Sequence, residues 1–93
     1  MIARVATFDE FPADDRTWVA ETAESIPGVL GVFHLTDPET GQSLSISFYK
    51  SEDAVTLATR AIEARRLELG LASRGWDRVQ LFEVVYSSWQ GAV

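Results

Sequence analysis

Three stretches of the chain have the two-residue side-chain period that is typical of β-strands. Polar and apolar residues alternate cleanly at 43–49, whereas residues 2–8 and 78–87 have apolar residues on both alternating sides. A fourth stretch, residues 29–36, is rich in residues that favour strands. The residues that follow it, 37–41, form an Asp-Pro-Glu-Thr-Gly sequence with the composition of a turn. We therefore expect residues 29–36 and 43–49 to pair as a β-hairpin.

Two other stretches repeat apolar residues every three or four positions, which predicts amphipathic helices. The first helix follows Asp14, a good N-cap, runs to Ser25 and is stopped by the Pro-Gly pair just beyond it. The second helix follows the N-cap candidate Ser51, and Gly70 is its expected C-cap. Acidic residues occupy its first turn and arginines its C-terminal half, which the helix dipole favours.

The predicted order βαββαβ is that of a split βαβ, or ferredoxin-like, α+β fold. Right-handed crossovers place both helices on one face of a four-stranded antiparallel sheet with the spatial order 4-1-3-2. The length of 93 residues is too short for two separate cores, so we expect one domain over residues 1–93, with an irregular tail at 88–93.

The two faces of this sheet are both rich in apolar residues, although two helices cover only one face. The apolar residues of one face are Ile2, Phe8, Leu30, Val32, Leu81 and Val85. Those of the other face are Ala3, Val5, Phe33, Ile46, Phe48, Phe82 and Val84. The uncovered face needs another apolar surface. We expect that surface to be a second copy of the chain, packed sheet on sheet in a two-fold dimer.

The register of the hairpin decides which face carries His34, since a slip of one residue reverses it. In one register His34 lies opposite Leu44, and in the other it lies opposite Ser45. We prefer the second register, because it gathers the large apolar residues of both strands on one side. We expect that apolar side to face the helices, so that His34, the serines and Tyr49 face the space between two subunits.

The charge balance and the absent residue types narrow the classes of function. Fourteen acidic and eight basic residues give a net charge of −6, which disfavours nucleic acid as a partner. The chain has no cysteine and one histidine, so no metal site is expected. No apolar run approaches the roughly 20 residues of a membrane-spanning helix. No targeting segment is recognisable, and a cytoplasmic location with no membrane partner is the expectation.

Two pairs of residues are candidates for chemistry. His34 and Tyr49 are the catalytic candidates, with His34 acting as an acid, a base or a hydrogen-bonding group for substrate. The alternative for His34 is a hydrogen-bonded residue of a subunit interface. Arg4 and Glu83 are charged residues within apolar strands: either they form a cross-strand ion pair, or Arg4 binds a carboxylate or phenolate of a substrate.

Other polar and aromatic residues complete the candidate substrate-binding set. Ser45 and Ser47 share one strand face and would line it with hydroxyl groups. No nucleophile-elbow sequence accompanies them, so hydrolase chemistry is not expected. Trp76 follows Arg-Gly in a connection and is placed to cap the mouth of a barrel. Trp18 is assigned to the core stripe of the first helix, and Trp89 in the tail is a candidate for dimer contacts.

Three segments and the length of about 90 residues carry a resemblance to a known family. They are residues 1–8, the Pro-Gly-Val-Leu-Gly sequence at 27–31, and the Phe-Tyr-Lys-Ser-Glu-Asp-Ala step at 48–54. Over residues 1–87 the chain resembles the dimeric α/β-barrel superfamily, and within it the antibiotic biosynthesis monooxygenase-like domains. In that superfamily two ferredoxin-like protomers pack their sheets into a shared barrel.

The resemblance implies a cofactor-independent monooxygenase or isomerase that acts on a small aromatic or polyketide-like molecule between the sheets. Haem-degrading members take an axial histidine from the second helix region, and residues 51–70 contain none, so no cofactor is expected. The alternative is a non-catalytic dimeric barrel that binds a small ligand or serves as an accessory protein, since the fold alone does not determine the activity.

Overall fold

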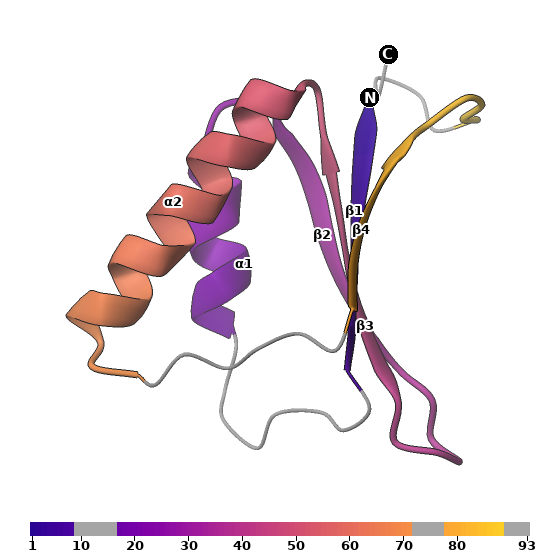
Figure 1. Ribbon diagram of the computed structural model, residues 1–93, viewed down its shortest axis with the longest axis horizontal. Helices are drawn as coiled ribbons and strands as arrows, with labels where there is room; N and C mark the ends of the chain where they lie inside the picture. Colours follow the sequence, from indigo (N-terminus) through magenta and orange to yellow (C-terminus); the bar gives the residue numbers. More distant parts are fainter. Residues whose placement is uncertain (9–16, 72–77, 89–93) are drawn as a thin grey trace.

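The computed structural model describes residues 1–8, 17–71 and 78–88, and it has the expected βαββαβ order (Figure 1). The elements are β1 (Ile2–Phe8), α1 (Thr17–Glu24), β2 (Val29–Thr36), β3 (Ser43–Tyr49), α2 (Glu52–Glu68) and β4 (Arg78–Glu83). The strands form one antiparallel sheet in the order β2-β3-β1-β4. The predicted α+β ferredoxin-like topology and strand order are therefore confirmed.

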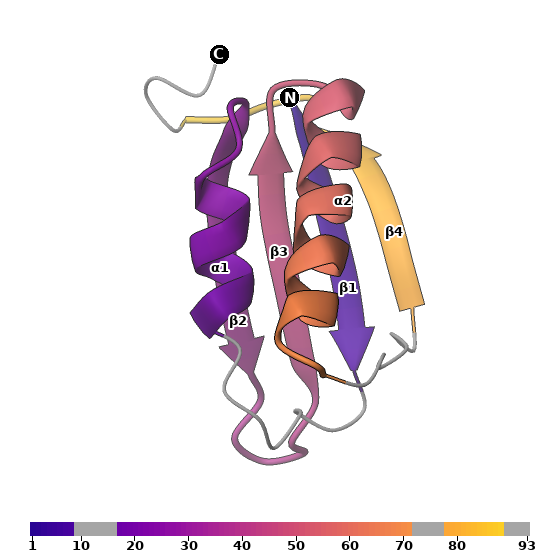
Figure 2. The ribbon, with the colours of Figure 1, turned by 90° about the vertical axis from the view of Figure 1, so that its left-hand side faces the viewer.

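Both helices lie on the same face of the sheet, with α1 over β2 and α2 over the middle of the sheet (Figure 2). The edge strand β4 lies to one side of both helices in this view. Helix α2 is closest to the sheet at its first turns and diverges from it toward its C-terminal end (Figure 1). Within the described residues, no helix is both long and apolar enough to cross a membrane.

The ends of the helices follow from local sequence. Ser51 has extended backbone angles, and its side chain accepts a hydrogen bond of 3.3 Å from the backbone N–H of Ala54, so the predicted N-cap is confirmed. The C-cap is Leu69, not the expected Gly70. Gly70 is the next residue and has a φ of +68°, a conformation that glycine adopts without strain. Helix α1 ends at Glu24, one residue before the predicted Ser25. The proposed N-cap Asp14 lies outside the described residues.

Strand β4 is shorter than predicted, since it covers Arg78–Glu83 rather than residues 78–87. Its last partner is Ile2, the first residue of β1, which pairs with Glu83. One more hydrogen bond, 2.9 Å from the N–H of Val84 to the carbonyl of Met1, completes the contact. The ladder between β1 and β4 has no further pair beyond this point in the described residues, and the Val85 side chain is 93% exposed.

The hairpin has the preferred register, with His34 opposite Ser45 and Phe33 opposite Ile46. A shift between Val29 and Gly31 leaves an irregularity at the start of β2. The pairing gathers two sets of residues. One face carries Ile2, Arg4, Ala6, Val32, His34, Thr36, Ser43, Ser45, Ser47, Tyr49, Val79, Leu81 and Glu83. The other carries Ala3, Val5, Thr7, Gly31, Phe33, Leu35, Leu44, Ile46, Phe48, Arg78, Gln80 and Phe82.

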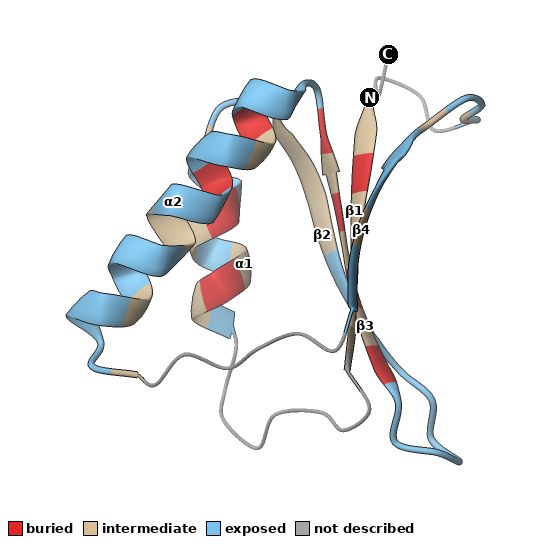
Figure 3. Ribbon diagram, in the orientation of Figure 1, coloured by how far each residue is buried: buried red, intermediate tan, exposed pale blue. Residues whose placement is uncertain are grey.

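The helices cover the first of these faces, which corrects the sequence-based assignment. Tyr49 is only 2% exposed and packs against Ala54 and Ala58 of α2. The serines of β3 are buried, whereas Phe33 on the opposite face is 48% exposed (Figure 3). The physical reason is the short step from β3 into α2. The chain turns through Lys50 and Ser51 directly into the helix, and the last side chain of the strand is covered by its first turns.

The other side of the sheet is therefore an open apolar face. It is defined here by Val5, Phe33, Leu35, Leu44, Ile46, Phe48 and Phe82. The rings of Phe33 and Phe48 meet edge to face, with their centres 6.0 Å apart. Leu81, which was expected to point away from the helices, is the partner of Arg4 and belongs to the helix-covered face.

Candidate functional site

Four polar residues lie side by side on the helix-covered face and are called here the polar strip: Arg4, Ser45, Ser47 and Tyr49. Arg4 is opposite Ser47 across the β1–β3 ladder, and Tyr49 is two residues farther along the same face of β3. Ser45, Ser47 and Tyr49 are all buried. The strip thus runs along the two central strands, in the layer between the sheet and the helices.

Buried hydroxyl groups are costly unless they form hydrogen bonds. Ser43, at the start of β3, is satisfied: its Oγ lies 3.1 Å from Thr36 Oγ1 and donates to the carbonyl of Gly41 at 3.5 Å. The Oγ atoms of Ser45 and Ser47 form no hydrogen bond with another described residue, and neither belongs to the fully buried side-chain atoms that lack a partner. These two hydroxyls can therefore serve a molecule bound in this layer.

Arg4 brings a positive charge into the same layer. Its partial burial lowers the pKa of the guanidinium from its ordinary value, and the charge of Tyr49 acts in the opposite direction. Arginine nevertheless stays protonated in proteins. A guanidinium that has lost part of its hydration binds anionic oxygen more strongly than one in bulk water. Arg4 is thus suited to hold a carboxylate, phenolate or enolate.

His34 and Glu83 lie on the same face as the polar strip but at its margins. His34 is exposed and pairs with Ser45, which places the two catalytic candidates His34 and Tyr49 on one side of the sheet. Glu83 is exposed on β4, where its partner is Ile2. Among the ion pairs of the described residues, none joins Glu83 to Arg4, so the cross-strand ion pair is not found. Trp76 lies outside the described residues.

Trp18 is a polar group that the sequence analysis missed. Its indole Nε1 is buried and has no hydrogen-bond partner within the described part of the chain. The apolar stripe of α1 predicted that Trp18 packs in the core, and the residue is half-buried. That prediction considered only the hydrocarbon part of the side chain. The indole N–H is a hydrogen-bond donor that a fully apolar core cannot satisfy. The presence of a tryptophan in the stripe therefore already indicated that a buried polar group was possible.

The arrangement fits the stabilisation of an oxygen anion better than nucleophilic attack or metal chemistry. A guanidinium and several hydroxyl donors on one surface can hold a developing negative charge. Across residues 1–8, 17–71 and 78–88, no three side chains of His, Asp or Glu come together as metal ligands.

Comparisons with known proteins identify the fold. Neither the scan against family models nor the search of curated proteins finds a match. Solved structures do match. Rv0793 of Mycobacterium tuberculosis superimposes with a TM-score of 0.69 at 16% identity, over 95% of this chain and 98% of its own.

Two further structures are similar over almost their whole length. A protein of Nitrosomonas europaea, provisionally assigned as an antibiotic biosynthesis monooxygenase, has a TM-score of 0.67 at 9% identity and covers 92% and 100% of the two chains. A variant of MhuD with two manganese protoporphyrin IX molecules bound per active site has a TM-score of 0.69 at 17% identity, over 96% and 99%.

Proposed function

Because this chain has the protomer fold of the antibiotic biosynthesis monooxygenase-like proteins, we propose that it binds and oxidises a small aromatic molecule without a cofactor. The observation that carries the proposal is the polar strip, a set of buried hydrophilic groups around a half-buried arginine beneath the helices. A purely structural sheet would place apolar side chains there. The ligand would lie between the sheet and the helices, and not between two subunits.

The residues of the strip supply what cofactor-free oxidation requires. The aromatic substrate must first lose a proton, since the resulting carbanion or phenolate can pass an electron to dioxygen directly. In the proposed mechanism His34 accepts this proton as the general base. Arg4 and the hydroxyl of Tyr49 stabilise the negative charge on the substrate oxygen. Ser45 and Ser47 orient the ring system through its other oxygen atoms.

A haem-dependent activity is not proposed, although one similar structure holds manganese protoporphyrins. Helix α2 spans Glu52–Glu68 and has no histidine in its sequence. The single histidine of the chain, His34, lies on β2 instead. The residues of α2 therefore offer no imidazole to a haem iron.

The open apolar face leads to a second part of the proposal, a homodimer in which two sheets pack face to face. Three large side chains of this face, Phe33, Leu35 and Phe82, are each nearly half exposed in one protomer. Phe48 and Ile46 lie between them on the same surface. An apolar sheet face of this kind is matched by a second copy of itself across a two-fold axis. A cytoplasmic location stays a prediction from the sequence.

Anthrone is a suitable probe of the proposed activity, because its central carbon loses a proton to give an oxygen-stabilised anion. Anthrone and dioxygen would yield anthraquinone and water: the methylene carbon is oxidised to a carbonyl, and one oxygen atom of dioxygen leaves as water. Arg4→Gln is expected to lower kcat/KM by about 100-fold, as loss of an oxyanion donor does elsewhere. Arg60→Gln, which removes an exposed arginine of α2, is the matched control and should leave the rate unchanged.

The outcomes separate the two candidate functions. Oxygen uptake that depends on Arg4 supports the cofactor-independent monooxygenase. Binding without turnover, weakened in the Arg4 variant, supports the non-catalytic ligand-binding protein instead. If the protein neither binds nor oxidises anthrone and related phenols, the helix-covered face is not a ligand site and the proposal fails.

A further inference from the structure

One row of side chains crosses the helix-covered face at Arg4 and changes in character along its length. Arg4 is paired with Ser47 of β3 on one side and with Leu81 of β4 on the other. Side chains that lie directly opposite each other on neighbouring antiparallel strands have their Cβ atoms about 4.5–5.5 Å apart. The register therefore places a hydroxyl group on one side of Arg4 and a hydrocarbon side chain on the other.

The apolar end of this row is open to solvent. Leu81 is 54% exposed, and Val79, two residues away on the same face of β4, is 44% exposed. The reason is visible in Figure 2, where α1 lies over β2, α2 lies over the middle of the sheet, and β4 lies to one side of both helices. The two side chains form an accessible hydrocarbon surface on the same face as Arg4.

The charge beside this surface selects the kind of molecule that covers it. Arg4 is half-buried and positively charged, which favours an anionic oxygen as its ligand. The Oγ of Ser47 forms no hydrogen bond with another described residue and is not fully buried, so it is a further polar contact for the same ligand. Covering Leu81 and Val79 with hydrocarbon removes apolar surface from water. An amphipathic anion meets both requirements.

We infer that β4 forms the apolar side of the ligand site, and that Leu81 contacts the hydrocarbon part of the ligand while Arg4 holds its anionic oxygen. This inference rests on the proposed ligand site. The hydrocarbon part extends toward Val79, because Glu83, on the other side of Leu81, carries an exposed charge that stays hydrated. The substrate class is therefore an aromatic anion with its charged oxygen at one edge and a hydrocarbon ring at the opposite edge. Leu81 is a specificity-determining residue.

Benzoate and 2-naphthoate test this inference, because they carry the same carboxylate and differ by one fused hydrocarbon ring. The wild-type protein should bind 2-naphthoate about 10-fold more tightly, since the added ring covers Leu81. Leu81→Ser should weaken the binding of 2-naphthoate about 5-fold to 10-fold and that of benzoate by less than about 2-fold. Isothermal titration calorimetry measures both affinities.

Two further variants separate the role of Leu81 from other effects. Leu67→Ser is the matched control, because Leu67 is also an exposed leucine, at 64%. It follows the buried Ala58 by nine residues, which places it on the opposite side of α2. Its substitution should leave both affinities unchanged. Arg4→Gln should weaken both compounds by a similar factor, since both carry the carboxylate.

The methyl groups of Leu81 provide a second measurement, which reports contact and not affinity. In a sample with ¹³C-labelled leucine methyl groups, the Leu81 resonances are identified by their absence in Leu81→Ser. They should move when 2-naphthoate is added, because the ring current of the added ring acts on them, and those of Leu67 should not move. If Leu81→Ser does not fold, Leu81→Ile identifies the same resonances, and the wild-type affinity ratio and shifts decide the question.

Three results would overturn the inference in distinguishable ways. If both compounds bind with the same affinity and the Leu81 methyl groups do not move, the ligand site stands and the role of β4 is wrong. If Leu81→Ser lowers the molar mass from that of a dimer to that of one chain, a second copy covers this surface instead of a ligand. If neither compound binds to the wild type, the proposed ligand site fails, and the inference fails with it.

Discussion

Gly28 packs closely against the start of α2. Its φ of +93° lies in the region that favours glycine. A Cβ atom added there would lie 2.8 Å from the Cβ of Ala54, which is closer than two carbon atoms approach without displacement. The carbonyl of Gly28 also accepts a 2.8 Å hydrogen bond from the N–H of Lys50. Gly28 thus holds the start of β2 against both the end of β3 and the first turn of α2.

Replacing Gly28 by alanine should lower the free energy of unfolding by about 2–4 kcal/mol, through backbone strain and overpacking together. Gly41→Ala is the matched control. Gly41 also has a positive φ, of +78°, but nothing lies within 4 Å of an added Cβ. Its substitution should cost about 1–2 kcal/mol, from strain alone. Urea denaturation followed by circular dichroism measures both, and equal losses would show that the contact with Ala54 is not tight.

The serines of β3 show how far a strand's polar residues can predict which of its faces is exposed. In an alternating sequence, small polar residues indicate the side that faces water or a polar space. Here they mark a side that is buried under helices, because the layer holds hydrophilic groups for a ligand in the present proposal. The sequence correctly grouped Ser45, Ser47 and Tyr49 on one face. Alternation alone could not tell which of the two faces the helices cover.

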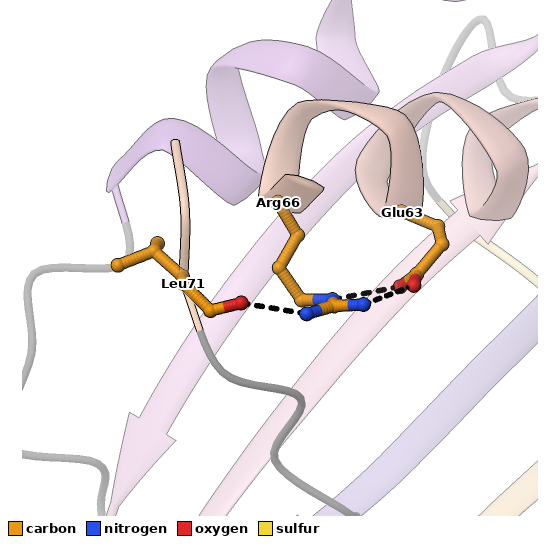
Figure 4. Close-up of polar contacts among 3 residues, drawn as sticks. All are labelled: Glu63, Arg66 and Leu71. Atoms are coloured by element: carbon orange, nitrogen blue, oxygen red, sulfur yellow. Dashed lines mark hydrogen bonds and ion pairs between the residues drawn. The ribbon is translucent and has the colours of Figure 1, made fainter. Parts of the chain in front are cut away.

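At the scale of the element, the end of α2 is held by one arginine. Arg66 donates to the carboxylate of Glu63 and, at 2.6 Å, to the backbone carbonyl of Leu71 (Figure 4). Its side chain is 18% exposed, compared with 47% for the neighbouring Arg65, which pairs with Glu68. Arg66 therefore ties the segment that leaves the helix back to its last turn.

Arg66→Ala should speed amide hydrogen exchange at the end of α2, most clearly at Leu71, whose N–H bonds to the carbonyl of Arg66. Arg65→Ala is the matched control, because its ion pair with Glu68 is exposed and holds no backbone. It should change the exchange much less. Equal effects of the two variants would contradict a specific role for Arg66.

The same contact predicts a dependence on pH. The hydrogen bond from Arg66 lowers the pKa of Glu63 below its ordinary value of 4.5. The stabilisation is therefore complete above pH 4.5 and is lost as the pH falls through the lowered pKa. The protection factor of the Leu71 amide, which corrects for the pH dependence of intrinsic exchange, should fall over that acidic range in the wild type. Glu63→Gln should abolish this fall.

The end of strand β4 could not be predicted from the local sequence pattern. Apolar residues that favour strands continue through Val84, Val85 and Tyr86, so the sequence predicted a strand up to residue 87. A strand, however, requires a partner, and the pairing of β4 with β1 ends at Glu83 and Ile2. Helix ends and strand starts could be predicted because they depend on local residues such as Ser51. The end of β4 depends on a neighbour that is distant in the sequence.

At the scale of the whole molecule, the sheet separates two kinds of surface. The helix-covered face carries the polar strip, whereas the open apolar face carries Phe33, Phe48 and Phe82. The sequence predicted two apolar-rich faces, and from them the need for a covering surface. It assigned the faces to the wrong sides. The large residues are outside the helix layer because a second copy, in our proposal, completes their burial.

Adjacent residues of β4 offer a matched test of this division. Phe82 pairs with Ala3 on the open face, and Leu81 pairs with Arg4 on the helix-covered face. Their exposed fractions are similar, at 48% and 54%. A lysine at either position adds the same charge to the same strand. A difference in oligomeric state between the two variants therefore depends on which face of the sheet carries the lysine.

The most direct test of this assignment of the two faces is the molar mass in solution, measured by light scattering. The proteins to compare are the wild type, Phe82→Lys and Leu81→Lys. We expect the wild type and Leu81→Lys to have twice the 10.3 kDa mass of the chain, and Phe82→Lys to have the mass of one chain. Dissociation of Leu81→Lys with an intact Phe82→Lys dimer would contradict the assignment of the faces. A wild type with the mass of one chain would contradict the sheet-on-sheet dimer itself.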